Sequence, residues 1–316
     1  MPKIKLNVKP LWLVTGGAGF IGSNIVEELV KRKQRVRVLD NFSTGYREFL
    51  KPFAGKIEII KGDLRKPKDV AKAVKNVTFI SHQAALRSVP RSVDNPRLSN
   101  KVNVEGTLNL LVEAKKAGVK KLVYASSSST YGDCKKFPQK EFFAPNPLSP
   151  YAVSKLAAEK YCLVWAKNFG LPAVVLRYFN VFGPRQSPYS KYSAVIPIFI
   201  NQIKKNKSLT IHSNGRQARD FTYIANVVSA NIKAMLSNVS GEVLNIACNR
   251  PHSILEITKL LEKFSGKKLK LKFQPKRTGD IANSRADISK AKKLIKYKVL
   301  VGFEAGLMKT WDYFNR

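Results

Sequence analysis

The segment 15–23, TGGAGFIGS, constrains the fold of this chain more than any other stretch. It follows the apolar run 11–14 and precedes apolar side chains at helical spacing, which is the pattern of a strand, a turn and a helix. Gly16, Gly19 and Gly22 lack the Cβ atoms that would keep a pyrophosphate away from the backbone N–H groups of such a turn. The segment therefore predicts a phosphate-binding turn at the start of a helix.

An acidic residue follows at the offset typical of a dinucleotide-binding unit. Residues 35–39 are predicted to form a second strand that ends at Asp40, roughly 20 residues beyond Gly22. A carboxylate at this place bonds ribose hydroxyls and repels a ribose phosphate, and Asn41 and Phe42 follow it instead of an arginine. NAD is therefore predicted as the cofactor in preference to NADP. The alternative is a doubly wound domain that binds no nucleotide and has a glycine turn of its own.

Strands and helices alternate through the first part of the chain, which is the signature of a parallel, doubly wound sheet. Further strands are expected at 56–61, 77–81, 121–125 and 173–178, and helices from about residue 67, over 97–117 and from residue 150. Beyond residue 180 the alternation loosens. We expect an α/β fold with a Rossmann domain over 1–180 and a smaller C-terminal α/β domain for the substrate over 181–316, part of 220–250 packing back on the sheet.

Composition narrows the class of protein. The 316 residues include three cysteines without metal-ligand spacing and three isolated histidines, so no metal site is expected. The formal charge of +36 comes from lysines spread along nearly the whole chain, which favours a basic surface over a nucleic-acid-binding tract. No apolar run is long enough for a signal peptide or a membrane span, so we expect a soluble, cytoplasmic protein that binds no membrane.

A tyrosine and a lysine stand four residues apart near the start of the helix expected from residue 150. At this spacing Tyr151 and Lys155 share one helix face. An ammonium beside a phenol favours the phenolate, which would move the pKa of Tyr151 toward neutrality and make it a general base. Such a pair also occurs by chance, but the serines at 126–129, which end the expected fifth strand, and the upstream nucleotide loop favour a catalytic interpretation.

Several other residues have both a functional and a structural interpretation. Asp63 follows the expected third strand and could bond the adenine amino group or cap the next helix. Ala84 and Ala85 follow the fourth strand, where they leave room for a flat ring or simply pack. Arg219 and Arg277 are candidate phosphate ligands, although arginines more often form surface ion pairs. The residues themselves leave these alternatives open.

Taken together, these features resemble the extended short-chain dehydrogenase/reductase family. The marks of that family here are TGGAGFIGS, Asp40, Gly62 with Asp63, the alanine pair, the serines at the strand end, and Tyr151 with Lys155. Within the family, the chain resembles the nucleotide-sugar 4-epimerases, above all those acting on UDP-N-acetylglucosamine, in LDNFSTG at 39–45, HQAALRSVPRSVDNP at 82–96, YASSSSTYGD at 124–133, SPYAVSK at 149–155 and LRYFNVFGPRQ at 176–186. The resemblance covers essentially the whole chain.

The resemblance implies roles for individual residues. Ser127 supplies a catalytic hydroxyl, Tyr151 is the base, and Lys155 orients the cofactor ribose and tunes the tyrosine. The residues implied in binding NAD are Gly16, Gly19, Phe20, Ile21, Gly22, Asp40, Asn41, Ser43, Thr44, Gly45, Asp63, Leu64, Ala84, Ala85, Arg87, Tyr151, Lys155 and Tyr178. Those implied in binding a UDP-sugar are Ser88, Ser127, Ser128, Ser129, Tyr151, Asn180, Val195, Arg219, Arg277, Asp280 and Ser284. No metal is implied.

The implied reaction inverts carbon 4 of a UDP-hexose. Tyr151 removes the hydroxyl proton while hydride passes to NAD, the 4-keto sugar turns over, and hydride returns to its other face, so NAD is retained. Ser284 stands where glucose-specific relatives have a bulky tyrosine, and it leaves volume for an N-acetyl group. UDP-N-acetylglucosamine and UDP-N-acetylgalactosamine are therefore the expected pair, with UDP-glucose and UDP-galactose as further substrates. A homodimer joined through the helix 97–117 and the helix carrying Tyr151 is implied as well.

Three alternative functions stand beside this one. A nucleotide-sugar 4,6-dehydratase needs an acid pair beside the active hydroxyl, where this chain has serines. A UDP-glucuronate 4-epimerase or decarboxylase needs a cation for the sugar carboxylate, which Arg87 or Arg185 could supply. Arg87 also departs from the small residue expected in the closest subgroup and from the lysine of glucose epimerases. A nonenzymatic NAD-sensing protein would not need Ser127, Tyr151 and Lys155.

Overall fold

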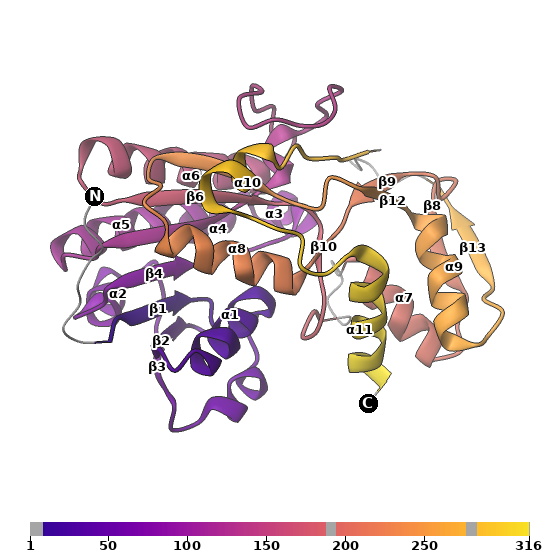
Figure 1. The fold of residues 1–316 in the computed structure, drawn as a ribbon, viewed down its shortest axis with the longest axis horizontal. Coiled ribbons are helices and arrows are strands. Elements are labelled where there is room, and N and C mark those ends of the chain that lie inside the picture. Colours follow the sequence, from indigo (N-terminus) through magenta and orange to yellow (C-terminus); the bar gives the residue numbers. More distant parts are fainter. Residues whose placement is uncertain (1–8, 188–193, 276–282, 316) are drawn as a thin grey trace.

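The computed structural model describes residues 9–187, 194–275 and 283–315. The larger part of these residues is built on a seven-stranded sheet with the order β11-β6-β5-β4-β1-β2-β3, in which all neighbours run parallel (Figure 1). Its strands are β1 Leu11–Thr15, β2 Arg35–Asp40, β3 Ile57–Lys61, β4 Phe79–His82, β5 Lys121–Ser127, β6 Ala173–Tyr178 and β11 Glu242–Ile246. The predicted α/β fold with a doubly wound parallel sheet is confirmed.

Helices cover both faces of this sheet, so alternate side chains of each strand enter two different apolar cores. On β1, Trp12 and Val14 join one core, whereas Leu11 and Leu13 join the other. The first core includes side chains of α1 Phe20–Lys31 and α8 Ile224–Leu236. The second core includes side chains of α2 Pro67–Val74, α5 Gly106–Lys116 and α6 Pro150–Asn168. The sheet is therefore packed between two helical layers, and the loops that follow its strands lie at its edge.

The helix predicted over 97–117 is interrupted. It consists of α4 (Pro96–Asn100), a π-helical turn (Lys101–Glu105) and α5, and it follows the short helix α3 (Val89–Asp94). In the π-helical turn, the Asn103 side chain accepts from the Leu86 N–H at 2.7 Å and donates to the Ser154 hydroxyl at 2.9 Å. The wider turn thus ties α4 and α5 to the loop after β4 and to α6.

The smaller part of the described chain lies to the right in Figure 1, around α7, α9 and α11. It has three two-stranded sheets, in which β7 pairs with β10, β8 with β13 and β9 with β12. Its helices and strands are α7 Val195–Lys204, α9 Ile254–Ser265, α11 Phe303–Asn315, β7 Val181–Phe182, β8 Leu209–His212, β9 Ala218–Asp220, β10 Thr222–Tyr223, β12 Pro251–Ser253 and β13 Leu271–Gln274. Between these segments α8 and β11 belong to the layers of the large sheet, and α10 (Ser289–Ile295) packs near β11.

The strand order reverses at β1, because β2 and β3 lie on one side of it and β4, β5, β6 and β11 on the other. In open α/β sheets, ligands bind in the crevice outside the carboxyl ends of the strands at such a reversal. The loops after β1, β2 and β4 therefore surround the expected position of a ligand. Within the described ranges, no helix is both long and apolar enough to cross a membrane.

Candidate active site

The turn between β1 and α1 has a backbone that only glycine fits. Gly16 has φ 68°, and a Cβ there would lie 2.7 Å from the Ala84 backbone. A Cβ on Gly22 would lie 2.1 Å from the carbonyl oxygen of Gly16. Gly19 is the N-cap of α1, where no side chain accepts from the free N–H groups of the first turn. These groups and the positive end of the helix dipole are suited to an anion, so the turn fits the pyrophosphate of a dinucleotide.

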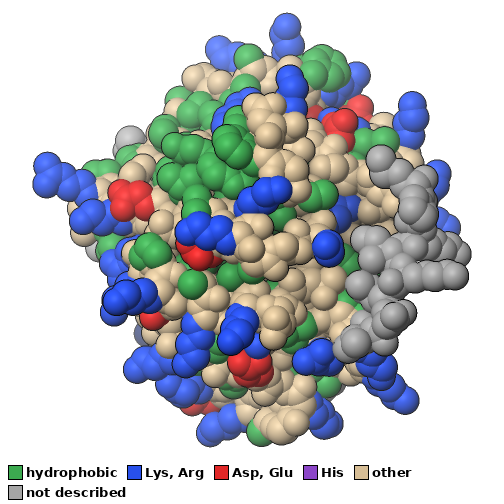
Figure 2. All heavy atoms as spheres, turned by 90° about the vertical axis from the view of Figure 1, so that its left-hand side faces the viewer, with side chains coloured by type: hydrophobic (Ala, Val, Ile, Leu, Met, Phe, Trp, Pro, Cys, Tyr) green, Lys and Arg blue, Asp and Glu red, His purple; other side chains and the backbone are tan. Residues whose placement is uncertain are grey.

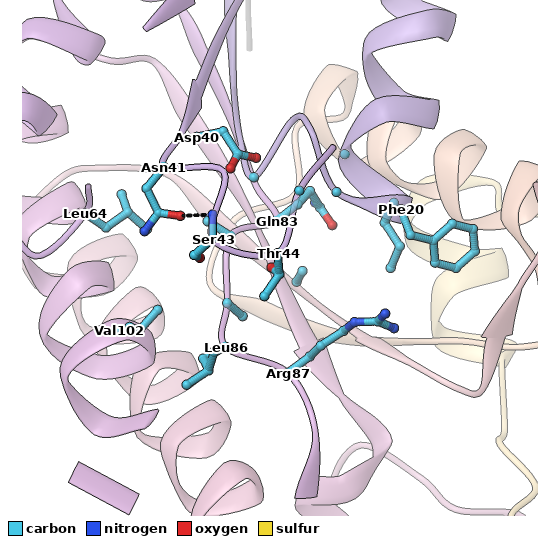
Figure 3. A pocket seen from close by; sticks show the side chains of 18 of the residues that line it. Phe20, Asp40, Asn41, Ser43, Thr44, Leu64, Gln83, Leu86, Arg87 and Val102 are labelled. Atoms are coloured by element: carbon cyan, nitrogen blue, oxygen red, sulfur yellow. Dashed lines mark hydrogen bonds between the residues drawn. The ribbon is translucent and has the colours of Figure 1, made fainter. Parts of the chain in front are cut away.

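A cavity of about 450 Å³ opens at this turn, at the carboxyl ends of the central strands (Figure 3). Asp40, Asn41 and Ser43, from the end of β2 and the loop after it, lie on one side, and Leu86 and Arg87 on the other. Every residue that the sequence implied in NAD binding lines the cavity: Gly16, Gly19, Phe20, Ile21, Gly22, Asp40, Asn41, Ser43, Thr44, Gly45, Asp63, Leu64, Ala84, Ala85, Arg87, Tyr151, Lys155 and Tyr178. Their roles as cofactor ligands stay predictions.

Two carboxylates of the cavity wall differ in their surroundings. Asp40 accepts from the Ala18 N–H at 2.9 Å and the Phe42 N–H at 2.8 Å, and its burial raises its pKa. Asp63 accepts from the Arg65 guanidinium at 2.6 and 3.0 Å, and this contact holds the pKa of Asp63 well below its usual range. The alternative of Asp63 as a helix cap is wrong, since the N-cap of α2 is Lys66 and has no side-chain cap bond. Asp63 instead forms an ion pair inside its own turn.

The predicted catalytic pair lies on α6 and faces the cavity. Ser149 begins the helix by accepting from the Ala152 N–H at 3.2 Å, so Tyr151 and Lys155 occupy its first two turns. Both side chains line the cavity, and Tyr151 is hydrogen-bonded to Ser127 at the end of β5. The Ser127 hydroxyl also accepts from the Ser129 hydroxyl at 2.9 Å. A hydroxyl, a phenol and an ammonium thus meet beside the glycine turn, which is the constellation that proton transfer at a hydroxyl-bearing carbon needs.

The electrostatics of this pair differ from the prediction. Burial raises the pKa of Tyr151, while the hydrogen bond to Ser127 and the positive charge of Arg87 act in the opposite direction. Burial also lowers the pKa of Lys155, to about 7, and its ammonium lies 4.4 Å from the centre of the Tyr124 ring. The prediction that Lys155 moves the pKa of Tyr151 toward neutrality is therefore wrong for the protein alone, because burial raises the pKa of the phenol and the cation that lowers it is Arg87.

The two arginines considered for a sugar carboxylate have different surroundings. Arg185 donates to the carboxylate of Glu27 and, at 3.1 Å, to the carbonyl of Ser23, both on α1. Arg87 lines the same cavity, is exposed in it, and interacts electrostatically with the phenol of Tyr151. One of the two cations is thus already paired, and Arg87 is the cation that acts on Tyr151.

The residues implied in substrate binding fall into three groups. Ser88 and Tyr151 line the cavity, and Ser128 and Ser129 begin the 3₁₀ turn that follows Ser127. Asn180 donates to the Ser284 hydroxyl at 3.0 Å and to the carbonyl of Asp220 at 3.2 Å, so residues far apart in sequence meet. Val195 begins α7, Arg219 lies on β9, and Arg277 and Asp280 lie outside the described residues.

Other cavity residues were missed from the sequence. Tyr46 and Phe49 come from the loop after β2, Gln83 and Leu86 from the loop after β4, and Ser126 from β5. Each stands within four residues of a predicted one, so extending the recognised motifs along their loops would have found them. Among the described residues, no group of three or more His, Cys, Asp or Glu side chains is placed to hold a metal ion.

Comparison with known proteins agrees with this geometry. A family model described as the NAD dependent epimerase/dehydratase family matches residues 12–247. A putative UDP-glucose 4-epimerase of Methanocaldococcus jannaschii is 38% identical over 285 residues, which are 89% of this chain and 91% of that protein.

Solved structures cover nearly the whole chain. A UDP-N-acetylglucosamine 4-epimerase from Methanobrevibacter ruminantium, in complex with UDP-N-acetylmuramic acid, has a TM-score of 0.93 at 38% identity and covers 98% of this chain and 99% of its own. A UDP-glucuronic acid 4-epimerase from Bacillus cereus, in complex with UDP-glucuronic acid and NAD, has a TM-score of 0.89 at 35% identity and covers 96% of this chain and 99% of its own. The chain therefore belongs to the NAD-dependent epimerase/dehydratase family and is an NAD-dependent enzyme of the epimerase type, built on the extended short-chain dehydrogenase/reductase fold.

Proposed function

We propose that this enzyme interconverts the carbon-4 epimers of a UDP-hexose and that UDP-N-acetylglucosamine and UDP-N-acetylgalactosamine are its preferred pair. The observation that carries the proposal is the contact of Ser127 with Tyr151, which lines the cavity that begins at the glycine turn. A phenol with a hydroxyl partner can exchange a proton with a sugar hydroxyl that lies between them. The chemistry therefore happens where β5, α6 and the phosphate-binding turn meet.

Each residue of the site has a distinct task in this proposal. The glycine turn would hold the pyrophosphate of NAD, and Asp40 would accept from its adenosine ribose. NAD, when bound, supplies the acceptor and donor of hydride. Tyr151 takes the proton from the hydroxyl at carbon 4 and returns it at the end of the reaction, and Ser127 keeps that hydroxyl in line with the phenol. Arg87 favours the ionised phenol through its charge.

Replacing Tyr151 by phenylalanine tests this assignment, because it removes the hydroxyl and keeps the ring. Interconversion should fall at least about a thousandfold, in the range expected when a general acid–base group is lost. NAD bound to the purified protein should remain at the wild-type level. Undiminished interconversion by the variant would refute the proposed mechanism.

The preference for an N-acetylated sugar rests on Ser284. Its small side chain is buried beside Asn180, and its hydroxyl accepts from the Asn180 amide and from the Asp220 N–H at 3.3 Å. A serine at this place leaves volume that a larger side chain would fill. Incubation with UDP-glucose, UDP-N-acetylglucosamine and UDP-glucuronate, with products identified by NMR, tests the preference. Equal or greater turnover of UDP-glucose than of UDP-N-acetylglucosamine would refute it.

A second candidate is the epimerisation or decarboxylation of UDP-glucuronate, favoured by the exposed cation of Arg87 in the cavity. Arg185 does not favour it, because its guanidinium is paired with Glu27. A sugar carboxylate would have to compete with that pair. We therefore rank the acidic sugar second, and turnover of UDP-glucuronate above that of both neutral sugars in the same NMR experiment would reverse the order.

We also propose that the enzyme is a homodimer joined partly through α6. This helix exposes apolar side chains at Val153, Tyr161 and Val164, and Trp165 stacks on the exposed ring of its C-cap residue Phe169, with 4.7 Å between the ring centres. Figure 2 shows apolar side chains gathered on one part of a face of the molecule, among scattered lysines and arginines. Contiguous apolar surface of this kind marks protein interfaces. Sedimentation should give twice the chain mass of 35.4 kDa, and a single species at 35.4 kDa would contradict the proposal.

A further inference from the structure

Glu159 lies fully buried between α6 and the sheet, outside the cavity, and the proposed chemistry does not use it. Its carboxylate accepts from the Ser126 hydroxyl at 2.7 Å and from the Arg177 guanidinium at 2.6 and 3.1 Å. The side chains of Glu159 and Arg177 are 0% and 2% exposed, so this ion pair is shielded from water. Three polar side chains from α6, β5 and β6 thus meet in the interior.

Stability alone does not account for such a pair. Removing two charges from water is expensive, and apolar residues of similar volume often replace a buried ion pair without loss of stability. A buried pair is better explained by the geometry that it enforces. The relevant geometry here is that of the short segment carrying Ser127, Ser128 and Ser129.

The first end of that segment is fixed through Ser126. In the β5–β6 register, Ser126 stands beside Arg177 and Ser127 beside Tyr178. On α6, Tyr151, Lys155 and Glu159 follow one another at four-residue intervals and so lie along one face. By holding Ser126, Glu159 restrains the backbone of the next residue, Ser127, which is hydrogen-bonded to Tyr151 on the same helix. The contact between Ser127 and Tyr151 thus depends on where Ser126 is held.

The second end of the segment is fixed through Arg177. Its guanidinium lies over the ring of Tyr131, 4.6 Å from the ring centre. Tyr131 ends the 3₁₀ turn Ser128–Tyr131, and its hydroxyl donates to Asn245 at 2.7 Å. The same ion pair therefore contacts the residues that begin and end the serine-bearing segment.

We infer that Glu159, together with Arg177, is a positioning residue that sets the Ser127 hydroxyl against the Tyr151 phenol by holding Ser126 and Tyr131. This inference rests on the proposed 4-epimerase activity. Glu159 does not line the cavity; besides holding the serine segment, its negative charge acts on the buried Lys155 and raises the pKa of that ammonium.

The test compares three variants as NAD-loaded enzymes with the wild type. Ser126→Ala removes the tether and leaves the ion pair. The double variant Glu159→Leu/Arg177→Met removes both charges together, so that neither is left unpaired. Ser99→Ala is the matched control, because Ser99 is also buried but its hydroxyl has no hydrogen-bond partner among the described residues. The measurements are kcat and KM for the UDP-sugar across pH, NAD content and thermal unfolding.

Ser126→Ala and the double variant should each lower kcat at neutral pH by about tenfold, with KM and NAD content unchanged. In both, the rise of kcat with pH should move to higher pH, because the contact with Ser127 that lowers the pKa of Tyr151 is weakened. A loss of fold would lower activity by the same factor at every pH. Ser99→Ala should match the wild type.

A kcat of Ser126→Ala within about twofold of the wild type, or an equal loss at every pH, would overturn the inference. Should the double variant fail to fold, the result for Ser126→Ala alone tests the positioning role. A wild-type enzyme that converts none of the UDP-sugars would refute the proposed function, whereas an active wild type with an unaffected Ser126→Ala refutes only the positioning role.

Discussion

Replacing Gly22 by alanine tests the phosphate-binding turn. The added methyl group would lie 2.1 Å from the carbonyl oxygen of Gly16 and 2.8 Å from the Cα of Gly17. Both are backbone atoms that cannot rotate away, and ordinary contact begins only at 3.4 Å. The start of α1 must therefore move away from the turn by on the order of 1 Å. That displacement separates N–H groups that would otherwise converge on one phosphate.

Two magnitudes follow from this displacement. Overpacking of a well-packed site costs about 1–3 kcal/mol of folding free energy, which would lower Tm by roughly 2–4 °C for each kcal/mol. The affinity for NAD should fall by about tenfold or more, equivalent to at least ~1.4 kcal/mol of binding free energy. Thermal unfolding measures the first effect. NAD content after purification and a titration with added NAD measure the second.

Gly302 provides the control. A Cβ added there meets nothing within 4 Å, and its φ is not in the left-handed region. Gly302→Ala should keep the wild-type NAD content and leave stability unchanged or raise it by about 0.4–1 kcal/mol. If Gly22→Ala retains NAD with wild-type affinity, the assignment of this turn to the pyrophosphate is refuted.

Two more predictions concern pH and substrate choice. Burial, and secondly the charge of Lys155, lower the pKa of His82 to about 3. The unfolded chain protonates His82 near pH 6.5, whereas the folded protein protonates it only near pH 3. The contribution of neutral His82 to the free energy of unfolding should therefore be complete above about pH 6.5. It should be lost as pH falls toward 3, by at most ~1.4 kcal/mol per pH unit. Urea unfolding at several pH values should show a weaker pH dependence for His82→Gln, and an unchanged dependence would contradict this reasoning. Ser284→Tyr should lower turnover of UDP-N-acetylglucosamine by about tenfold or more while sparing UDP-glucose, and equal losses with both sugars in the NMR assay would argue against a role in recognising the N-acetyl group.

The central sheet and its ligand crevice were predictable because local patterns decide them. The run 11–14, the glycine turn and Asp40 follow one another without a long connection, so their spacing alone predicted the strand, the turn and the helix that border the cavity. The long helix was less predictable. Its apolar spacing continues through Lys101–Glu105, and only the bonds of Asn103 to Leu86 and Ser154 explain the wider turn. Tertiary partners of this kind leave no periodic trace in a sequence.

The charge balance of the site was the least predictable part. A spacing of four residues placed Tyr151 and Lys155 together, but it could not reveal how deeply both would be buried. The same holds for Arg185, whose partner Glu27 lies on α1, far away in sequence. Desolvation and distant ion pairs depend on the whole fold, and they decide which cations of the cavity remain available.

The position of β11 has a consequence for protein engineering. The chain leaves the large sheet at Tyr178 and rejoins it at Glu242, where β11 pairs with β6 along its whole length. A fragment cut near residue 180 would therefore lack its outermost strand and expose the hydrogen-bonding edge of β6, which invites aggregation. A self-sufficient dinucleotide-binding fragment would need residues 224–246 joined to the end of β6 through a short linker. That linker would replace the roughly 45 residues that lie between β6 and α8 in the sequence. The dinucleotide-binding part, built on the large sheet, is thus one body in space that is formed by two separate stretches of the sequence.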